Sequence, residues 1–272
     1  MLPRLTALSR LPPVLRTAAA TYATHAQSVV LKLLARVPFK VQSVPLAIPK
    51  CTVATGGVGL AGMYDELFVH HMYESPKPLP ARPRIVDVGG HLGLASIYFL
   101  SRYPDCDLTT IEPNPWLASL LRANLAPWSV RSRVLEGALS VSAGHADFHF
   151  SSDNALNVTG GLENREPPER DVSSVQVACL DATEVLAEPV DLMKLDVEGH
   201  EFQLLPLPIF RPAHIRNLVI EFHDLDKRRK AFAELMRELR DVRGYRASSA
   251  DGVELPAELP ADMPDCVVLK LY

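Results

Sequence analysis

Four short segments of the sequence carry glycines or charged residues of a kind that can bind a ligand. The first, VDVGGHLGLAS (residues 86–96), is an apolar run that passes into three glycines: Gly89, Gly90 and Gly93. Glycines permit a tight turn and let a ligand approach the backbone closely. His91 stands where a dinucleotide fingerprint needs its second glycine, so the pattern does not indicate pyrophosphate binding. The carboxylate of Asp87 suits a cationic amino group, and a plain strand–turn–helix junction is the alternative interpretation.

The second segment, LTTIEPNP (residues 108–115), ends an apolar run at Glu112. An acidic residue about 20 positions after such glycines is where a carboxylate holds the two hydroxyls of a ribose by bidentate hydrogen bonds. We therefore predict that Glu112 binds a ribose. A glutamate that faces solvent at the end of a strand is the alternative.

The third segment, DLMKLDVEGHE (residues 191–201), brings Lys194, Asp196 and Glu198 to one end of an apolar run. Charged groups at the end of a buried strand are costly unless they pair with each other or serve a function. This arrangement predicts a functional site at that strand end. The alternative is a structural ion pair between Lys194 and Asp196 that steadies the turn.

The fourth segment, NLVIEFHDL (residues 217–225), places Glu221 and His223 two positions apart, on the same side of a predicted strand. An imidazole titrates near neutral pH and therefore suits proton transfer. His223 is accordingly a candidate for acid–base chemistry. A surface histidine at the start of a helix is the alternative interpretation.

From Arg84 onward, short apolar runs alternate with helical stretches, which predicts βαβ units around a parallel sheet. The expected strands cover residues 84–88, 107–111, 133–139, 145–150, 174–180, 190–195, 218–222 and 266–272. The expected helices cover residues 92–102, 116–125, 199–205 and 225–242. The polar stretch 151–172 predicts a long loop, and long loops in compact domains are often functional.

The overall composition is that of an ordinary globular protein. The 272 residues include 47% hydrophobic residues and carry a net charge of −4. Because no basic surplus is available to neutralise phosphates, we do not expect nucleic acid as a partner. The four cysteines form no CxxC pair and no zinc-binding pattern, so we expect buried free thiols.

The first 64 residues contain arginines and lysines but no Asp or Glu, and we treat 1–64 as an extension of a domain that spans 65–272. Three interpretations stay open: an organelle transit peptide, an amphipathic segment that contacts an anionic membrane, and a helical extension or lid that packs on the domain. No run is long enough to span a membrane, and Arg and Pro residues interrupt any secretory signal. We expect a cytoplasmic protein, with organellar targeting or peripheral membrane association as alternatives.

Taken together and in this order, the four segments resemble the FkbM family of S-adenosylmethionine-dependent methyltransferases over roughly residues 80–225. The resemblance rests on VDVGGHLG, IEPNP, Asn124 and KLDVEGHE, of which the last (residues 194–201) is the most specific. This chain departs from the family pattern in two places. Gly90-His91 replaces an Ala-Asn pair, and His200 replaces an alanine.

The resemblance implies an α/β fold with a doubly wound, mostly parallel, seven-stranded Rossmann-like methyltransferase sheet that ends in an antiparallel strand. It also implies S-adenosyl-L-methionine as the cofactor, whose ammonium and sulfonium groups suit acidic neighbours. The cofactor-binding residues that we predict lie around the glycine turn and the following strand ends: Asp87, Gly89, Gly90, His91, Gly93, Glu112, Pro113, Asn114, Ala138 and Asp196.

Methyl transfer is an in-line displacement, so the enzyme chiefly holds the nucleophile, the methyl carbon and the sulfur in line. A hydroxyl acceptor must also lose its proton. We predict His223 as the base, with Asp196 orienting it or acting as the base itself, and Glu198 and His200 as substrate-binding residues. A divalent cation at Asp196, Glu198 and His223 is an alternative way to acidify the hydroxyl, but no motif of hard oxygen ligands is present and we assign no metal ligand.

The resemblance implies O-methylation of a hydroxyl on a sugar, a polyketide-like compound or another small-molecule acceptor. Three competing hypotheses are a noncatalytic binding or scaffold protein that keeps the fold, an N-methyltransferase, and an NAD(P)-dependent oxidoreductase. A fold alone does not establish a reaction, so turnover separates the first of these from an enzyme. The missing G-x-G-x-x-G pattern counts against the oxidoreductase.

Overall fold

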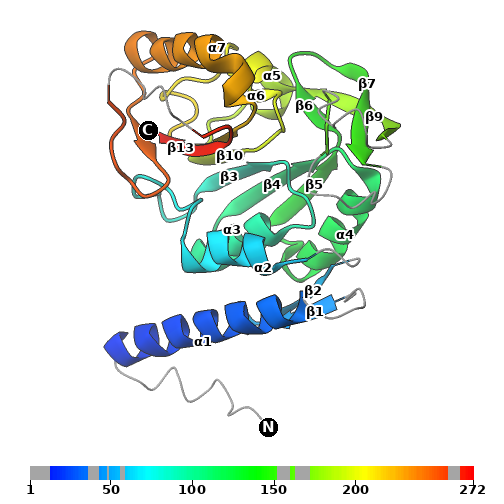
Figure 1. Cartoon of the computed structure of the whole chain (residues 1–272), viewed down its shortest axis with the longest axis vertical. Coiled ribbons are helices and arrows are strands. Elements are labelled where there is room, and N and C mark those ends of the chain that lie inside the picture. Colours follow the sequence, from blue (N-terminus) through cyan, green and yellow to red (C-terminus); the bar gives the residue numbers. More distant parts are fainter. Residues whose placement is uncertain are drawn as a thin grey trace. The chain divides into compact units, whose positions relative to one another are not determined.

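The computed structural model describes residues 13–35, 43–47, 49–55, 59–151, 160–162, 172–256 and 264–272 (Figure 1). These residues form two compact units, divided between His71 and Met72. The division into an extension of residues 1–64 and a domain of residues 65–272 stays a prediction.

The first unit contains one long helix and a small antiparallel hairpin. Its elements are α1 (Pro13–Leu34), β1 (Ser43–Leu46), β2 (Cys51–Ala54), α2 (Ala61–Tyr64) and the π-helix η2 (Asp65–Val69). The ammonium group of Lys32 on α1 lies 2.6 Å from the carboxylate of Asp65. Among the described residues, no helix combines the length and the apolar character that a membrane span needs.

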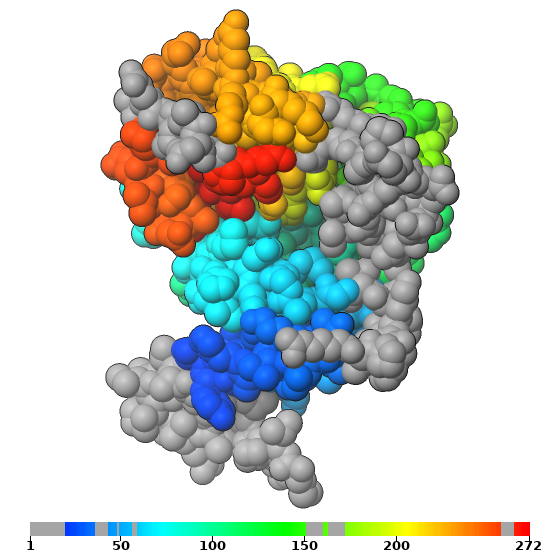
Figure 2. Space-filling view, viewed as in Figure 1, coloured from blue at the N-terminus to red at the C-terminus, as the bar shows by residue number. Residues whose placement is uncertain are grey.

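The second unit is built on a seven-stranded sheet. From one edge to the other, the strands are β12 (Ala247–Ser249), β13 (Val267–Leu271), β11 (Leu218–Phe222), β10 (Leu192–Leu195), β3 (Arg84–Val88), β4 (Asp107–Glu112) and β5 (Ser132–Glu136). Neighbours from β11 to β5 run parallel, whereas β13 runs antiparallel to both β11 and β12. The predicted mostly parallel sheet with a last antiparallel strand is therefore confirmed. In Figure 2, the C-terminal segment (red) lies at the viewed face beside α7.

Helices cover both faces of this sheet, which makes the fold doubly wound. Figure 1 shows α3 (Leu94–Arg102) and α4 (Pro115–Leu125) on one side, and α6 (Glu201–Leu204) and α7 (Leu225–Arg237) on the other. The short helices α5 (Ala182–Val185), η3 (Ala126–Trp128) and η4 (Glu238–Val242) complete the second unit. Because the central strands are covered on both faces, every residue of β10 is buried. The chain order reverses between β3 and β10, and ligands bind at the carboxyl ends of strands at such a switch point.

A second, four-stranded sheet belongs to the same unit. It consists of β6 (Ala138–Ser140), β9 (Val172–Asp181), β7 (Gly144–Ser151) and β8 (Gly160–Gly161), in that order. β7 and β9 form a long antiparallel pair, and β6 runs parallel to β9. Phe148 and Phe150 form a small apolar core of their own with Val177 and Ala138.

The prediction of one strand over residues 133–139 is wrong in part, because two strands of different sheets occupy that stretch. β5 ends at Glu136, and Ala138 begins β6. The break falls at Gly137, where φ is +151° and a Cβ atom would lie 2.8 Å from the carbonyl oxygen of Ala178. Only glycine allows the chain to pass this close to β9. Of the predicted loop 151–172, residues 152–159 and 163–171 lie outside the described residues.

Candidate functional site

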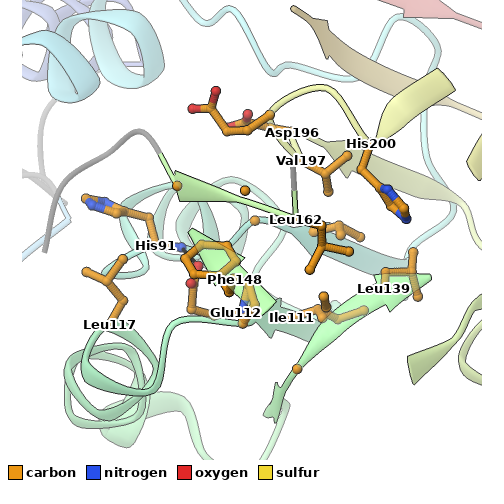
Figure 3. A pocket seen from close by; sticks show the side chains of 18 residues that line it. His91, Ile111, Glu112, Leu117, Leu139, Phe148, Leu162, Asp196, Val197 and His200 are labelled. Atoms are coloured by element: carbon orange, nitrogen blue, oxygen red, sulfur yellow. Dashed lines mark hydrogen bonds between the residues drawn. The ribbon is translucent and has the colours of Figure 1, made fainter. Parts of the chain in front are cut away.

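An open cleft lies at the carboxyl ends of β3, β4 and β10 (Figure 3). It holds about 630 Å³ of empty space, part of it open to solvent, which is a common size for a ligand pocket. The lining residues come from the strand ends and from the second sheet: Val88, Gly89, His91, Ile111, Glu112, Pro113, Leu117, Gly137, Ala138, Leu139, Phe148, Gly160, Gly161, Leu162, Asp196, Val197, Glu198 and His200.

The glycine turn after β3 is fixed to both neighbouring strands. The backbone N–H groups of Gly89 and Gly90 donate to the carbonyl oxygen of Ile111, at 3.0 and 2.9 Å. Gly89 has a φ of +79°, and a Cβ atom there would lie 1.9 Å from the carbonyl oxygen of Asp196. The sequence therefore needs glycine at position 89 for two reasons, a left-handed backbone and direct backbone contact with the segment that follows β10.

Two side chains that line the cleft, those of His91 and Glu198, belong to residues with left-handed backbones. Their φ angles are +50° and +53°. Such conformations cost a non-glycine residue about 1–3 kcal/mol and concentrate at functional sites, where the surrounding structure enforces them. The two positions follow adjacent strands, β3 and β10, and both line the cleft.

Glu112 at the end of β4 is held by backbone donors. Its Oε2 accepts a 2.7 Å hydrogen bond from the N–H of His91, and its Oε1 accepts a 2.8 Å bond from the N–H of Asn114. Only 4% of the residue is exposed. Burial raises the pKa of Glu112 to about 7, although these hydrogen bonds favour the charged form. Both carboxylate oxygens are thus fixed at the wall of the cleft, an arrangement that suits two adjacent hydroxyl donors.

Lys194 is a buried cation behind the cleft. Its Nζ donates to the carbonyl oxygen of Gly89 at 2.7 Å and lies 3.1 Å from Asp196 Oδ2 and 3.6 Å from Asp87 Oδ1. Burial by itself lowers the pKa of Lys194, but the charges of Asp196 and Asp87 outweigh it and raise the pKa. The ion pair between Lys194 and Asp196 is present in the structure, and its contribution to the stability of the turn stays a prediction.

A cluster of acidic residues surrounds His223, which follows β11. Its Nδ1 lies 3.0 Å from Oε1 of Glu201, a residue with no exposed surface. Its Nε2 lies 3.6 Å from Glu198 Oε2, 3.6 Å from Glu221 Oε1 and 3.9 Å from Asp196 Oδ1. His223 itself is 7% exposed. The cluster adjoins the cleft because Asp196 and Glu198 belong to both.

These surroundings do not suit the predicted role of His223 as a base. Burial lowers the pKa of His223, but hydrogen bonds with Cys266 and Glu201 and the charges of Glu198 and Asp196 raise it to about 11. An imidazole that already holds its proton at neutral pH cannot accept another. The physical reason for the discrepancy is the number of carboxylates packed around one ring.

The structure brings most of the predicted site residues together at the cleft. Gly89, His91, Glu112, Pro113, Ala138, Asp196, Glu198 and His200 line it. The other predicted cofactor-binding residues lie behind the lining: Asp87, Gly90, Gly93 and Asn114. That any of them contacts a cofactor stays a prediction.

The residues behind the lining have visible structural roles. Asp87 is completely buried and accepts a 2.6 Å hydrogen bond from the hydroxyl of Ser96. The side chain of Asn114 caps α4 by accepting from the N–H of Trp116 at 3.0 Å. A Cβ atom on Gly93 would lie 2.7 Å from Leu121. These residues shape the turn and the helix start that present the cleft.

Sequence reasoning missed several residues of the site. Phe148, Gly160 and Leu162 line the cleft from the second sheet, and no motif marks them. Glu201 and Tyr73 support the acidic cluster, Tyr73 by donating from its hydroxyl to Glu221 Oε2 at 2.8 Å. Glu201 stands inside the segment DLMKLDVEGHE, where the sequence pattern predicts only that it belongs to a helix. Its partner, His223, is 22 residues away in the sequence.

Comparison with known proteins gives a consistent result. The family model described as the methyltransferase FkbM domain matches residues 87–247. Over 173 residues the chain is 30% identical to Methyltransferase sdnD of Sordaria araneosa. This alignment covers 53% of this chain and 66% of that protein. Over 231 residues the chain is 25% identical to Methyltransferase 1 of Beauveria bassiana. This alignment covers 77% of this chain and 86% of that protein. The crystal structure of a SAM-dependent methyltransferase from Agrobacterium tumefaciens aligns with a TM-score of 0.44 and 13% identity, over 87% of this chain and 72% of that one.

Proposed function

This chain belongs to the FkbM family of methyltransferases, and we propose that it methylates a hydroxyl oxygen of a small-molecule acceptor. We infer that its methyl donor is S-adenosylmethionine, because the chain belongs to a methyltransferase family and the glycine turn and Glu112 suit this cofactor. Residues 87–247 of the family match contain the glycine turn, Glu112, Asp196 and His223.

The cofactor end of the cleft is the side formed by β3 and β4. Glu112 offers two fixed carboxylate oxygens to the ribose hydroxyls, and the backbone of Gly89 lets the methionine part approach closely. Leu117, Phe148 and Leu162 provide apolar surface for a flat base. This assignment leaves the end formed by Asp196 and Glu198 for the acceptor.

The observation that carries the proposal is the pair of carboxylates, Asp196 and Glu198, at that end of the cleft. Their side chains are 25% and 18% exposed, so they remain accessible to a ligand. A hydroxyl is a weak nucleophile until it loses its proton, and carboxylates within reach both orient it and take up the proton. The leaving sulfur departs uncharged, so no acid is required. His223 holds a positive charge behind the two carboxylates and orients them.

The test begins with calorimetric titration of the full chain with S-adenosylhomocysteine. Transfer from S-adenosylmethionine to a panel of sugar and polyketide-like alcohols, each with its amine counterpart, then identifies the acceptor atom by mass spectrometry. We expect methylated oxygen in the wild type and loss of turnover, with retained S-adenosylhomocysteine binding, in Asp196→Asn. The matched control is Asp226→Asn, because Asp226 is an exposed acid that lies outside the cleft lining.

Two results would overturn the proposal. Transfer to amines alone would make the chain an N-methyltransferase. Tight binding of S-adenosylhomocysteine without transfer to any acceptor, by a protein shown to be folded, would favour a noncatalytic binding protein.

A further inference from the structure

The acidic cluster around His223 contains three donor atoms that face one another from two different strand ends. Asp196 Oδ1 and Glu198 Oε2 come from the segment after β10, and His223 Nε2 comes from the residue after β11. All three atoms lie within 4.8 Å of one another. Direct hydrogen bonds do not explain this spacing, because Nε2 is 3.6 Å from the glutamate oxygen and 3.9 Å from the aspartate oxygen.

The spacing matches that of ligands on one metal ion. Two donor atoms that are each about 2.1 Å from an ion lie about 3 Å apart when they are adjacent in an octahedral shell and about 4 Å apart when they are opposite. The observed distances of 3.6 and 3.9 Å fall inside this interval. Small side-chain rotations would therefore bring the three atoms into coordination without moving the backbone.

The surroundings of His223 provide a second, independent indication. A histidine that binds a metal usually donates its other ring N–H to a carboxylate, which fixes the ring and makes it a better ligand. Here Nδ1 lies 3.0 Å from Oε1 of Glu201, so Nε2 is the nitrogen that points to the carboxylates. Glu201 is completely buried, and within the described residues its Oε2 has no hydrogen-bond partner. The contacts of this buried carboxylate are thus confined to Oε1, which leaves the negative charge of the group only partly compensated.

Negative charges outnumber positive charges around the His223 ring. Four carboxylates approach the His223 ring, from Asp196, Glu198, Glu201 and Glu221. The nearby positive charges are fewer: in the absence of an ion His223 holds one proton, and Lys194 is shared between Asp196, Asp87 and the carbonyl oxygen of Gly89. Burying several like charges is costly unless opposite charge accompanies them. A divalent cation supplies that charge.

We propose that Asp196, Glu198 and His223 bind a divalent cation at the acceptor end of the cleft, and that His223 gives up its Nε2 proton when the ion binds. Two carboxylate oxygens and one imidazole nitrogen suit Mn²⁺, Mg²⁺ or a similar ion, because hard oxygen ligands dominate the set. Glu221 is engaged by the Tyr73 hydroxyl at 2.8 Å and lies 3.2 Å from the Cys266 sulfur, so it supports the site from outside.

This inference rests on the proposed function and gives it a more effective chemistry. A carboxylate alone is a weak base for an alcohol, whereas a bound metal ion would lower the pKa of a hydroxyl group that coordinates it. An acceptor hydroxyl that completes the coordination shell releases its proton to water in the same way. The resulting alkoxide forms the new O–CH₃ bond as the S–CH₃ bond breaks, and the electron pair of that bond stays on the neutral sulfur.

The test is binding of Mn²⁺ alone to the full chain, after treatment with a chelator, followed by electron paramagnetic resonance of the free ion. We expect one Mn²⁺ per chain and binding at least about 10-fold weaker in Glu198→Gln. Glu201→Gln, which keeps all three ligands and alters only the partner of Nδ1, is expected to weaken binding by about 10-fold as well. Circular dichroism checks that each variant is folded.

The chain offers a matched control in a second acidic group, formed by Asp224, Asp226 and Asp265. Asp226→Asn is expected to bind Mn²⁺ like the wild type. Equal binding by the wild type and Glu198→Gln, or loss of binding in Asp226→Asn, would overturn the inference. The absence of binding at about 1 mM Mn²⁺ would also overturn it, because the weakest biological sites for such cations have dissociation constants of about 1 mM. If Cys266→Ser lost Mn²⁺ binding while Glu198→Gln bound the ion normally, the ligands would be Glu221, His223 and Cys266. This result would overturn the proposed ligand set.

The outcome also separates this inference from the proposed function. Methyl transfer to a hydroxyl that persists in excess chelator would overturn the cation site and leave O-methylation in place. Binding of Mn²⁺ with the expected dependence on Glu198, but transfer to amines alone, would retain the ion site and overturn O-methylation.

Discussion

Lys194 Nζ donates a 2.7 Å hydrogen bond to the carbonyl oxygen of Gly89 and so fastens the end of β10 to the turn that follows β3. The same nitrogen lies 3.1 Å from the carboxylate of Asp196. One buried cation therefore joins the glycine turn, where we place the cofactor, to the carboxylate that we place against the acceptor. Methyl transfer requires the cofactor and the acceptor to be aligned, and the contacts of Lys194 hold together the two segments that we expect to bind them.

Replacement of Lys194 by methionine is expected to lower the free energy of unfolding by about 3–5 kcal/mol, because Asp87 is then left as a buried charge without its cation. Urea denaturation measures this change. Lys227→Met is the matched control, since the side chain of Lys227 is 71% exposed and its Nζ lies 3.4 Å from Asp224 Oδ1. A Lys194 variant as stable as the Lys227 variant would show that the buried cation does not stabilise the turn.

The central sheet could be predicted from the sequence because its strands are short apolar runs with clear ends. The predicted ranges 84–88 and 218–222 agree with β3 and β11 at both ends. Strands that are covered on both faces are mostly apolar, as β3 and β11 are, and Gly89 and His223 follow these two strands. For β3 and β11, the strand ends predicted from local composition are therefore the strand ends of the folded protein.

The second sheet could not be predicted in the same way, because its pairing joins distant parts of the chain. β6 contacts β9, with Ala138 opposite Cys179, and nothing near residue 138 indicates that partner. The charge state of His223 was inaccessible for a similar reason. Its position at a strand end was readable from the sequence, but its pKa depends on Glu201 and Glu198, which another segment supplies.

The pKa of about 7 for Glu112 predicts that cofactor binding depends on pH. An ionised carboxylate accepts hydrogen bonds from both ribose hydroxyls, whereas the protonated form has lost part of this capacity. We expect S-adenosylhomocysteine to bind about 10-fold more weakly at pH 6 than at pH 8. Calorimetry at both values, with Glu112→Gln as the variant that cannot titrate, measures the effect. An equal pH dependence in the two proteins would assign it to another group.

The same shift predicts how the stability of the cofactor-free protein varies with pH. The pKa of Glu112 rises from 4.5 to about 7 on folding, so the folded state binds the proton more tightly than the unfolded state does. The associated stability is fully present below pH 4.5 and is lost as the pH rises to about 7, by about 3 kcal/mol in total. Urea unfolding at pH 5 and pH 8 should therefore favour Glu112→Gln over the wild type increasingly at the higher pH. A constant difference between the two proteins would contradict the shift.

Substitution of Gly89 by alanine tests the contact between the glycine turn and the segment after β10. The new Cβ atom would lie 1.9 Å from the carbonyl oxygen of Asp196, and the φ of +79° disfavours any side chain. Because backbone occupies the space on that side, the turn or the Asp196 segment must move. We expect loss of at least about 1–3 kcal/mol of stability, from the backbone strain alone, together with weaker S-adenosylhomocysteine binding.

Gly62→Ala is the matched control for this substitution. Gly62 lies in α2, and no atom approaches within 4 Å of the position that its Cβ would take. Alanine is favoured over glycine inside a helix by about 1 kcal/mol, so this variant should be as stable as the wild type or slightly more stable. If Gly89→Ala unfolded at the same urea concentration as Gly62→Ala and bound S-adenosylhomocysteine normally, the contact between Gly89 and Asp196 would not be a fixed part of the site. The assignment of the cofactor to this turn would then lose its structural basis.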